Sequence, residues 1–492
     1  MQIYHYRSVK RALQEIKEGT LWAAKSETLN DPLEGYAQVV WKGDRIAWEG
    51  LLRNYIWSLY RCLILFELDD DIDSLLDNSA IFLGFDVVED APIWDILQRL
   101  ADRFIHDEIV SRFVSFFEKN EECTADELCF MLRFLRPIAW NLCAEEYESQ
   151  GNFLLSDYKN DNLDRDKLKE ITSFLDDEEI TEDKIKALES IANHITQIIE
   201  ILQIINYDKN EMESQDKEKI RRARKWRTWQ EILYNFPLKY VKGLEKLIYP
   251  DGFVVCFSVD CENSAMWGHY ASDHKGVCLL YETVSKDGKE TLPLKHKESK
   301  SLVEYSNFEV KCVKYRDMVL KRNFFETLGE LNMLQIKKWL TNEDNEKSRY
   351  LTIYENKEWR KQYWNGFDEK YFTKMKDWEK EQEYRLVIPG VMLDNVSVMD
   401  AESTEEIEKK EPTGIVLEYA PDTLKGIVFG IRTNLHDKVK LLKAIKESGR
   451  DLKDFKVFEA RYDERNRKIR VDENKIIKQF SDVLFNDDIK NK

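Results

Sequence analysis

Two glutamates late in the chain have the spacing for acid–base or electrostatic chemistry. They are Glu381 and Glu383, in the segment WEKEQEYRLVIPG at residues 378–390. In a strand that begins near residue 381, both carboxylates share one face with Arg385, because successive side chains alternate between faces. Two carboxylates on one face repel each other unless a cation lies beside them. The segment therefore predicts either a site for a positively charged group, such as a developing oxocarbenium ion, or a solvent-exposed face balanced by the arginine.

A histidine and an arginine share one side of the first predicted strand, which is IYHYR at residues 3–7. Alternation puts His5 and Arg7 on the same face. Arginine holds a phosphate through two parallel hydrogen bonds, and histidine can donate to a ribose or an amide. The segment predicts a contact with a nucleotide or, in the simpler interpretation, the polar outer face of an edge strand.

A turn with the sequence LNDPLEG follows at residues 29–35. The proline at position 32 favours an extended Asp31, and the side chains of Asn30 and Asp31 can hydrogen-bond nearby backbone amides. We expect a rigid corner that either has a structural role alone or places Asn30 and Glu34 at a cleft.

The densest polar and aromatic passage lies at residues 256–276, between two apolar segments. Its candidate binding residues are Ser258, Trp267, His269 and Tyr270. His269 and His274 are five residues apart, which differs from the i, i+4 spacing of two metal ligands on one helical face, and no third ligand is evident. A ligand-binding loop is the leading interpretation. The alternatives are a hydrophobic plug with hydrogen-bonded histidines and a metal-assisted hydrolase site at His269, Asp273 and His274.

The elements that must position these residues come from both ends of the chain. Residues 1–36 have the pattern of strand, helix and strand, with Gly19 as a helix stop, and strand-like segments return after residue 252. Between them, residues 46–247 carry apolar side chains at helical intervals. The pattern predicts an α+β protein with a mixed sheet and a large all-α insertion. The predicted parts are residues 1–40 and 248–460 for the α+β domain, 41–247 for the helical insertion, 321–372 for a helical excursion, and 461–492 for a C-terminal tail.

The composition is that of an acidic, folded protein. The 492 residues carry 75 basic and 93 acidic side chains, a formal net charge of −18, and 43% of them are hydrophobic. Such a charge argues against wrapping nucleic acid with the whole surface, although one basic run, KEKIRRARKWR at residues 217–227, is either a solvated helix face or a polyanion contact. Eight scattered cysteines, with no signal peptide and no bilayer-spanning apolar run, predict a cytoplasmic protein without disulfides or membrane contact.

Four ordered motifs together resemble a bacterial domain family of unknown function. Its hallmarks are an aromatic first strand, an Asn-Asp-Pro-x-Glu turn, a Met-Trp-x-His-Tyr loop followed by His-x-Gly, and a Trp-x-x-Glu-x-Glu-Tyr-Arg strand. This sequence has the corresponding motifs at residues 4–7, 30–34, 266–270 with 274–276, and 378–385. The resemblance covers about residues 1–36 and 250–430 and brings no established activity.

The chain also resembles, more weakly, the ADP-ribosyltransferase superfamily. In that superfamily a first-strand Arg or His, a Ser or Tyr on a central strand, and a Glu-x-Glu strand that runs into Pro-Gly form an NAD site. Here the order is His5 and Arg7, then Ser258, then Glu381 and Glu383. The central strand continues as FSVD, where the superfamily often has Ser-Thr-Ser.

This second resemblance implies an ADP-ribosyltransferase-like fold and a set of roles around NAD as the substrate. Glu383 would stabilise positive charge on the ribose, Glu381 would orient or deprotonate the acceptor, and Ser258 would hold Glu383 or the ribose. The other implied NAD contacts are His5 and Arg7 at ribose and diphosphate, Tyr270 or Trp267 at nicotinamide, and His269, Asn30 and Glu34 at the cleft.

We therefore expect an NAD-dependent ADP-ribosyltransferase-like enzyme whose helical insertion selects a protein or nucleic-acid acceptor, as in a bacterial defence or toxin effector. No metal is expected. The alternative is a non-catalytic module of bacterial anti-phage defence, in which the same pocket binds a nucleotide and the helical insertion contacts a partner.

Overall fold

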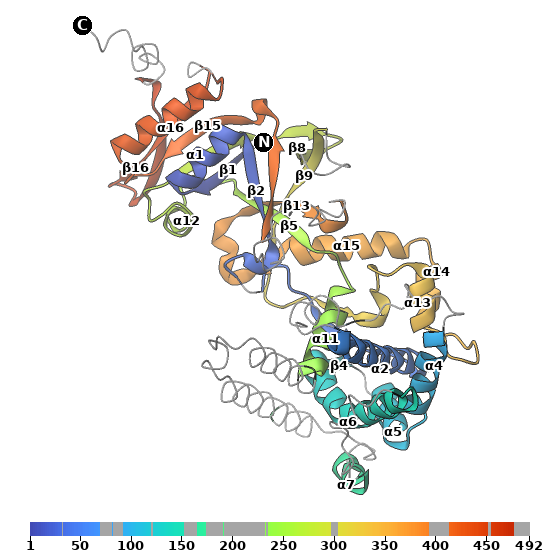
Figure 1. Cartoon of the computed structure of the whole chain (residues 1–492). Coiled ribbons are helices and arrows are strands. Elements are labelled where there is room, and N and C mark those ends of the chain that lie inside the picture. Colours follow the sequence, from blue (N-terminus) through green and yellow to red (C-terminus); the bar gives the residue numbers. More distant parts are fainter. Residues whose placement is uncertain are drawn as a thin grey trace, which may run out of the picture. The chain divides into compact units, whose positions relative to one another are not determined.

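The computed structural model describes residues 1–31, 33–68, 81, 92–119, 122–151, 165–173, 190, 232, 235–296, 304–392, 413–450 and 454–476. The chain forms two compact units, and its architecture is mixed α+β. Unit 1 consists of Met1–Ala37, Pro250–Leu320 and Gly366–Lys492, and unit 2 consists of Gln38–Tyr249 and Lys321–Asn365. Unit 1 carries the large sheet, and unit 2 carries most of the long helices (Figure 1).

Six strands of unit 1 close into a barrel. Each strand is hydrogen-bonded to the next, and the ring closes because β5 pairs with both β13 and β2. In order around the barrel the strands are β2 (Thr20–Lys25), β5 (Gly252–Ser258), β13 (Glu383–Pro389), β9 (Ser306–Cys312), β8 (Lys289–Lys295) and β14 (Gly414–Tyr419). All six pairings are antiparallel. Because the ring is closed, these six strands have no free sheet edge. One of them, β5, also pairs with a seventh strand outside the barrel.

That seventh strand, β1 (Gln2–Arg7), starts a second set of strands that continues the sheet outward from β5. β1 meets β5 only at Tyr4 and Ser258, whereas it pairs along its whole length with β6 (Val277–Glu282). The remaining strands of this set are β15 (Leu424–Phe429), β16 (Lys456–Asp463) and β17 (Lys468–Glu473). The strands predicted at residues 3–7 and after residue 252 are confirmed.

The hairpin of β16 and β17 lies partly in the stretch predicted as a C-terminal tail. Asp463 closes this hairpin, because its carboxylate accepts hydrogen bonds from the backbone amides of Arg465 and Asn466. The β17 strand then pairs antiparallel with β16 through Glu473. Residues 477–492 of the predicted tail lie outside the described residues.

One apolar core fills the barrel and continues beneath two helices, α1 (Val9–Glu18) and α16 (Leu435–Glu447), which lie side by side (Figure 1). The helix predicted after the first strand is confirmed. It begins after Ser8, whose hydroxyl accepts from the Arg11 amide, and ends at Gly19. Gly19 has φ 68°, a left-handed conformation that costs glycine little because it lacks a Cβ.

The opposite face of the outward strands is covered by the short helix α12 (Ser264–Tyr270). The sequence predicted a loop here. A helix forms because the Asn263 side chain accepts hydrogen bonds from the amides of Ala265 and Met266, which otherwise have no intrahelical partner. The Trp267 ring then packs edge-to-face against Tyr6, with ring centroids 5.1 Å apart.

The strand that we predicted to begin near residue 381 begins two residues further along the chain, at Glu383. Glu381 is the last residue of a 3₁₀ helix, η6 (Lys376–Glu381), and Gln382 is left-handed with φ 46°. A left-handed residue breaks the extended backbone, so the strand starts at Glu383. Before η6, β12 (Thr373–Met375) pairs in parallel with β10 (Lys314–Arg316).

The described part of unit 2 is mainly helical, and unit 2 also contains residues 321–365, which lie in the stretch that we predicted as a helical excursion of the α+β domain. The reason is a strand pairing: β11 (Lys321–Asn323) runs parallel to β3 (Gln38–Trp41), which also pairs with β4 (Cys123–Thr124). The helices of unit 2 are α2 (Arg45–Leu68), α4 (Pro92–Ile105), α5 (Glu108–Lys119), α6 (Ala125–Ser149), α7 (Arg165–Ile171), α11 (Phe236–Lys246), α13 (Met333–Trp339), α14 (Leu351–Glu355) and the first half of α15 (Trp359–Tyr371).

Helix α2 is the centre of unit 2, since its aromatic side chains contact several other helices. Trp48 stacks on Phe117 at 4.2 Å between ring centroids, and Tyr55 meets Tyr240 edge-to-face at 5.1 Å. The basic run at residues 217–227 lies outside the described residues. Among the helices that the structure describes, none is long and apolar enough to cross a membrane.

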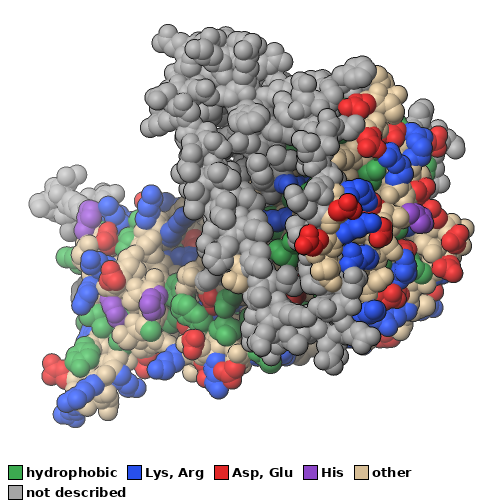
Figure 2. Space-filling view, turned by 90° about the horizontal axis from the view of Figure 1, so that it is seen from below, with side chains coloured by type: hydrophobic (Ala, Val, Ile, Leu, Met, Phe, Trp, Pro, Cys, Tyr) green, Lys and Arg blue, Asp and Glu red, His purple; other side chains and the backbone are tan. Residues whose placement is uncertain are grey.

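One face of the described surface mixes basic and acidic side chains. On the face shown in Figure 2, basic and acidic groups alternate over the described surface. The net charge of −18 is therefore not gathered into one acidic patch on this face.

Candidate functional site

Unit 1 contains a cavity of about 230 Å³ where β1 and β2 diverge along one edge of β5. On its other edge β5 pairs with β13 over its full length. On the cavity edge it pairs with β2 at Phe253 and Val254 and with β1 at Ser258 alone. The backbone between these two pairings is left open, and Cys256 and Phe257 line the cavity there.

The two faces of the sheet bring different residues to this cavity. Tyr4, Ser258 and Glu383 are directly opposite one another across β1, β5 and β13, so they share one face. His5 and Arg7 lie on the other face, the one that carries the main core. Both sets line the cavity because it lies at the split in the sheet.

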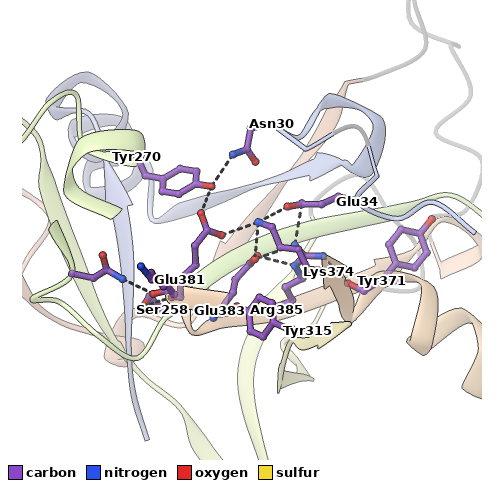
Figure 3. A network of polar contacts seen from close by, with 12 residues as sticks. Asn30, Glu34, Ser258, Tyr270, Tyr315, Tyr371, Lys374, Glu381, Glu383 and Arg385 are labelled. Atoms are coloured by element: carbon purple, nitrogen blue, oxygen red, sulfur yellow. Dashed lines mark hydrogen bonds and ion pairs between the residues drawn. The ribbon is translucent and has the colours of Figure 1, made fainter. Parts of the chain in front are cut away.

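A network of buried charges forms the first wall (Figure 3). At its centre the Lys374 ammonium group lies 2.5 Å from Glu34, 2.7 Å from Glu381 and 3.3 Å from Glu383. Arg385 is 1% exposed and donates to both oxygens of Glu383, from Nε at 2.7 Å and from Nη2 at 3.0 Å. Its Nη2 also lies 3.0 Å from Glu34. Three carboxylates thus share two cations, all of them nearly inaccessible to solvent.

The pKa values of the network differ with the partners of each group. Burial alone would raise the pKa of Glu383, but Arg385 and Lys374 lower it to about 2. Burial raises the pKa of Glu34, and the neighbouring Glu383 adds to this rise against the opposing effects of Arg385 and Lys374. Glu383 is therefore firmly ionised, and Glu34 takes a proton more readily than Glu383.

Hydrogen bonds join this network to the N-terminal turn and to α12. The Tyr270 hydroxyl donates to Glu381 at 2.8 Å and accepts from the Asn30 amide at 2.8 Å. Burial, and then the charge of Glu381, raise the pKa of Tyr270 well above its ordinary value. Trp378 lies against the same cation, with the Lys374 ammonium 4.6 Å from its ring centroid.

Ser258 fixes the backbone at the base of this wall. Its hydroxyl accepts from the Asp260 amide at 3.1 Å and lies 3.1 Å from the carbonyl oxygen of Glu381, to which it can donate. It has no hydrogen bond to the Glu383 side chain among the described contacts. Ser258 therefore positions the backbone that leads into Gln382 rather than the carboxylate of the next strand.

The second wall is a smaller cluster around Glu15 of α1. Nδ1 of His5 lies 3.3 Å from Glu15, and Nε of Arg7 donates to Glu15 at 2.6 Å. Burial, and then the charge of Arg7, lower the pKa of His5, so its ring is neutral near pH 7. Burial opposes ionisation of Glu15, but His5 and Arg7 together bring its pKa below the usual value. The charge of Arg7 is thus already balanced by a carboxylate.

The structure brings together most, but not all, of the residues that the sequence singled out. The candidates that line the cavity are His5, Arg7, Asn30, Glu34, Ser258, Tyr270, Glu381 and Glu383. Trp267 does not line it, because its ring is buried in the core of α12 and its Nε1 donates to the Cys261 carbonyl. His269 is exposed on the outer side of α12 and does not line the cavity.

Lys374 and Glu15 were not among the candidates. Glu15 had a signal in the sequence, since it falls on the apolar face of α1 together with Ala12 and Ile16. Lys374 had none, although Glu381 and Glu383 follow it by seven and nine residues, because its third partner, Glu34, comes from the N-terminal turn. Pro32 of the predicted corner lies outside the described residues, while Asp31 accepts from the amide of Leu33 as expected of such a turn.

The proposed metal alternative at His269, Asp273 and His274 gains no support from the geometry. Within the described parts of the chain, no group of three or more His, Cys, Asp or Glu side chains could hold a metal ion. His274 and its two preceding residues have positive φ values, which form a tight loop before β6.

Comparison with known proteins finds one family model, and it matches a segment that includes residues of both units. Residues 266–386 match a family model described as "Protein of unknown function (DUF2971)". No match is found among curated proteins or among solved structures. The matched region runs from α12 to β13 and contains Tyr270, Lys374, Glu381, Glu383 and Arg385. Residues 266–386 are therefore similar to a domain family of unknown function, and this matched region carries most of the buried network.

Proposed function

We propose that unit 1 binds NAD in this cavity and, with an ADP-ribosyltransferase-like fold, transfers its ADP-ribose to an acceptor. The observation that carries the proposal is the surplus of buried carboxylates, three against two cations, at the cavity wall. Cleavage of the nicotinamide–ribose bond leaves positive charge on the sugar. A fixed carboxylate in a dry site stabilises that charge more in the transition state than in the ground state.

In the proposed reaction the bond between ribose C1′ and the nicotinamide nitrogen breaks, and its electron pair leaves with nicotinamide. An oxygen or nitrogen of the acceptor, or of water, forms the new bond to C1′ and gives up its proton to a carboxylate. The strand register supports this assignment. Ser258 of β5 lies directly opposite Glu383 of β13 on one side and Tyr4 of β1 on the other.

The contacts favour Glu381, rather than Glu383, as the carboxylate that meets the sugar. Both oxygens of Glu383 are held by Arg385 and Lys374, which compensates its charge. One oxygen of Glu381 faces only the neutral Tyr270 hydroxyl. We assign the electrostatic role to Glu381 and give Glu383 the role of holding the two cations in place.

The size of the cavity limits what it encloses. At about 230 Å³ it is smaller than the roughly 300–1,000 Å³ typical of pockets that enclose a drug-sized ligand. We propose that it takes the nicotinamide and its ribose, with the neutral His5 ring as a hydrogen-bond donor to the sugar. The adenosine half would then lie outside the cavity.

Release of nicotinamide from NAD by the full-length chain, measured by chromatography, tests the proposal. We expect Glu381→Gln to lower turnover on the order of 10²- to 10³-fold with little change in NAD affinity. The matched control is Glu379→Gln, in the same 3₁₀ helix but exposed to solvent, which should keep full turnover. A chain that neither binds nor consumes NAD would refute the proposal.

A second candidate is a nucleotide-sensing module without catalysis. The observation that favours it is the full pairing of Glu383, which leaves only one incompletely balanced carboxylate at the wall. This second candidate predicts that calorimetry detects NAD binding and that no nicotinamide is released, even when candidate acceptor proteins and nucleic acids are present.

A further inference from the structure

Unit 2 contains a larger cavity, of about 520 Å³, that has no part in the proposed reaction. Its walls come from α2, α4, α13 and a tight turn at residues 341–347, which Thr341 and Lys347 close through a β-bridge. Asn345 in that turn is left-handed, with φ 60°. The volume lies within the range of pockets that hold small molecules.

Close packing of α2 against α13 places a buried arginine at the base of this cavity. A Cβ at Gly50 would lie 1.9 Å from the Trp339 carbonyl oxygen, so only glycine allows this approach. One turn later, Arg53 is 7% exposed and its Nη1 donates to the Thr341 carbonyl at 3.1 Å. Arg53 Nε has no hydrogen-bond partner. A buried guanidinium N–H without an acceptor is costly, which points to an acceptor supplied by a ligand.

Cations dominate the cavity lining in a protein whose net charge is strongly negative. Lys337, Lys338 and Lys347 join Arg53, and the one carboxylate in the lining is Glu343. Across the described part of the chain, neither Lys337 nor Lys347 has a carboxylate within ion-pair distance. Glu343 opposes an anion only weakly, because its hydrogen bond to Asp102, followed by burial, raises its pKa to about 7.

A flat aromatic surface lies next to these cations. Trp94 is half-buried, and its ring centroid is 5.5 Å from that of Trp57, which is anchored by a hydrogen bond from its Nε1 to the Leu97 carbonyl. The Lys338 ammonium lies 4.5 Å from the Trp94 ring centroid. A ligand with both a planar ring and negative charge would meet both features at once.

We propose that this cavity is a ligand site for a nucleoside di- or triphosphate, with the phosphates against Arg53, Lys337 and Lys347 and the base against Trp94. A cavity of about 520 Å³ fits one nucleotide, whereas a nucleic-acid strand requires an extended basic track. The site lies wholly within unit 2 and is independent of NAD chemistry in unit 1.

Calorimetric titration of the full-length chain with ATP and, separately, with inorganic tripolyphosphate tests this site. Both compounds supply phosphates, but only ATP supplies a base. We expect ATP to bind on the order of tenfold more tightly, because stacking on an aromatic side chain contributes roughly 1–3 kcal/mol. Trp94→Ala should abolish that advantage and leave tripolyphosphate binding unchanged.

Lysine variants locate the phosphates. Lys337→Gln and Lys347→Gln should each weaken both compounds on the order of tenfold, since each removes a charge-assisted hydrogen bond. Lys361→Gln is the matched control, an exposed lysine of the same unit outside the cavity, and should change neither. Absence of ATP binding, or binding that the two cavity variants leave unaltered, would overturn the site. Equal affinity for ATP and tripolyphosphate would overturn the assignment to a nucleotide.

Discussion

Replacing Glu383 by glutamine tests whether the buried charge network stabilises unit 1. The substitution keeps the size of the side chain but removes the charge that both Arg385 and Lys374 face. Lowering the pKa of Glu383 from 4.5 to about 2 corresponds to roughly 3 kcal/mol of folding free energy. Removing one partner of a buried ion pair typically costs about 3–5 kcal/mol, so both routes give a similar magnitude.

The matched substitution Glu34→Gln should lower the free energy of unfolding by a smaller amount. It removes the carboxylate whose pKa is raised and leaves two carboxylates for two cations. The expected loss is about 1 kcal/mol, from weakened hydrogen bonds to Lys374 and Arg385. Glu379→Gln, on the solvent side of η6, should change the free energy of unfolding by less than about 0.5 kcal/mol.

Hydrogen exchange measured by mass spectrometry suits this test, because it reports on the two units separately. Peptides from β5 and β13 should exchange faster in Glu383→Gln, while peptides from α2 and α6 should not change. Unchanged protection of β5 and β13 would refute the stabilising role of the network. Equal losses of hydrogen-exchange protection in Glu383→Gln and Glu34→Gln would refute the argument that charge balance decides the effect.

Three further predictions concern the same walls. Because its pKa is lowered, Glu383 contributes stability that is complete above pH 4.5 and lost as the pH falls towards 2. In urea unfolding, the difference in unfolding free energy between the unchanged protein and Glu383→Gln should therefore vanish over that range. A difference that does not depend on pH would contradict this. Tyr270→Phe removes the hydrogen bond to Glu381 and should cost about 1 kcal/mol in urea unfolding, while a variant as stable as the parent would show that the bond contributes nothing. Glu15→Gln should lower the pKa of His5 further, because the carboxylate is the group that favours the imidazolium; the His5 proton resonances would show this, and a higher pKa would exclude it.

The strands and the first helix were readable from local sequence, and their assembly was not. Apolar runs such as FVVCFS at residues 253–258 identify a buried strand without its neighbours, and Gly19 marks a helix end without saying what the helix covers. Barrel closure depends on pairings between β2, β5 and β13, which are far apart in sequence. A local pattern carries no information about such partners.

For the candidate site, too, local pairs of residues could be predicted, but their assembly could not. Alternation correctly put His5 with Arg7 and Glu383 with Arg385, but it could not show that the two pairs lie on opposite faces of the sheet. Glu381 was placed on the wrong element, because a left-handed glutamine has no clear signature in sequence. The aromatic ring of Trp267 was expected at a ligand and lies in the core, where large rings gain most from burial.

The long separation between β2 and β5 has a consequence for synthesis. During translation β1 and β2 leave the ribosome well before β5 exists, and roughly 200 intervening residues take roughly 10–40 s to make at about 5–20 residues per second. For that time β1 and β2 lack all their partner strands, because β5, β6 and β14 follow residue 250, while the unit 2 helices that precede β5 can already form through local contacts. The nascent chain therefore carries two unpaired strands, and a ribosome pause before residue 252 would lengthen their exposure.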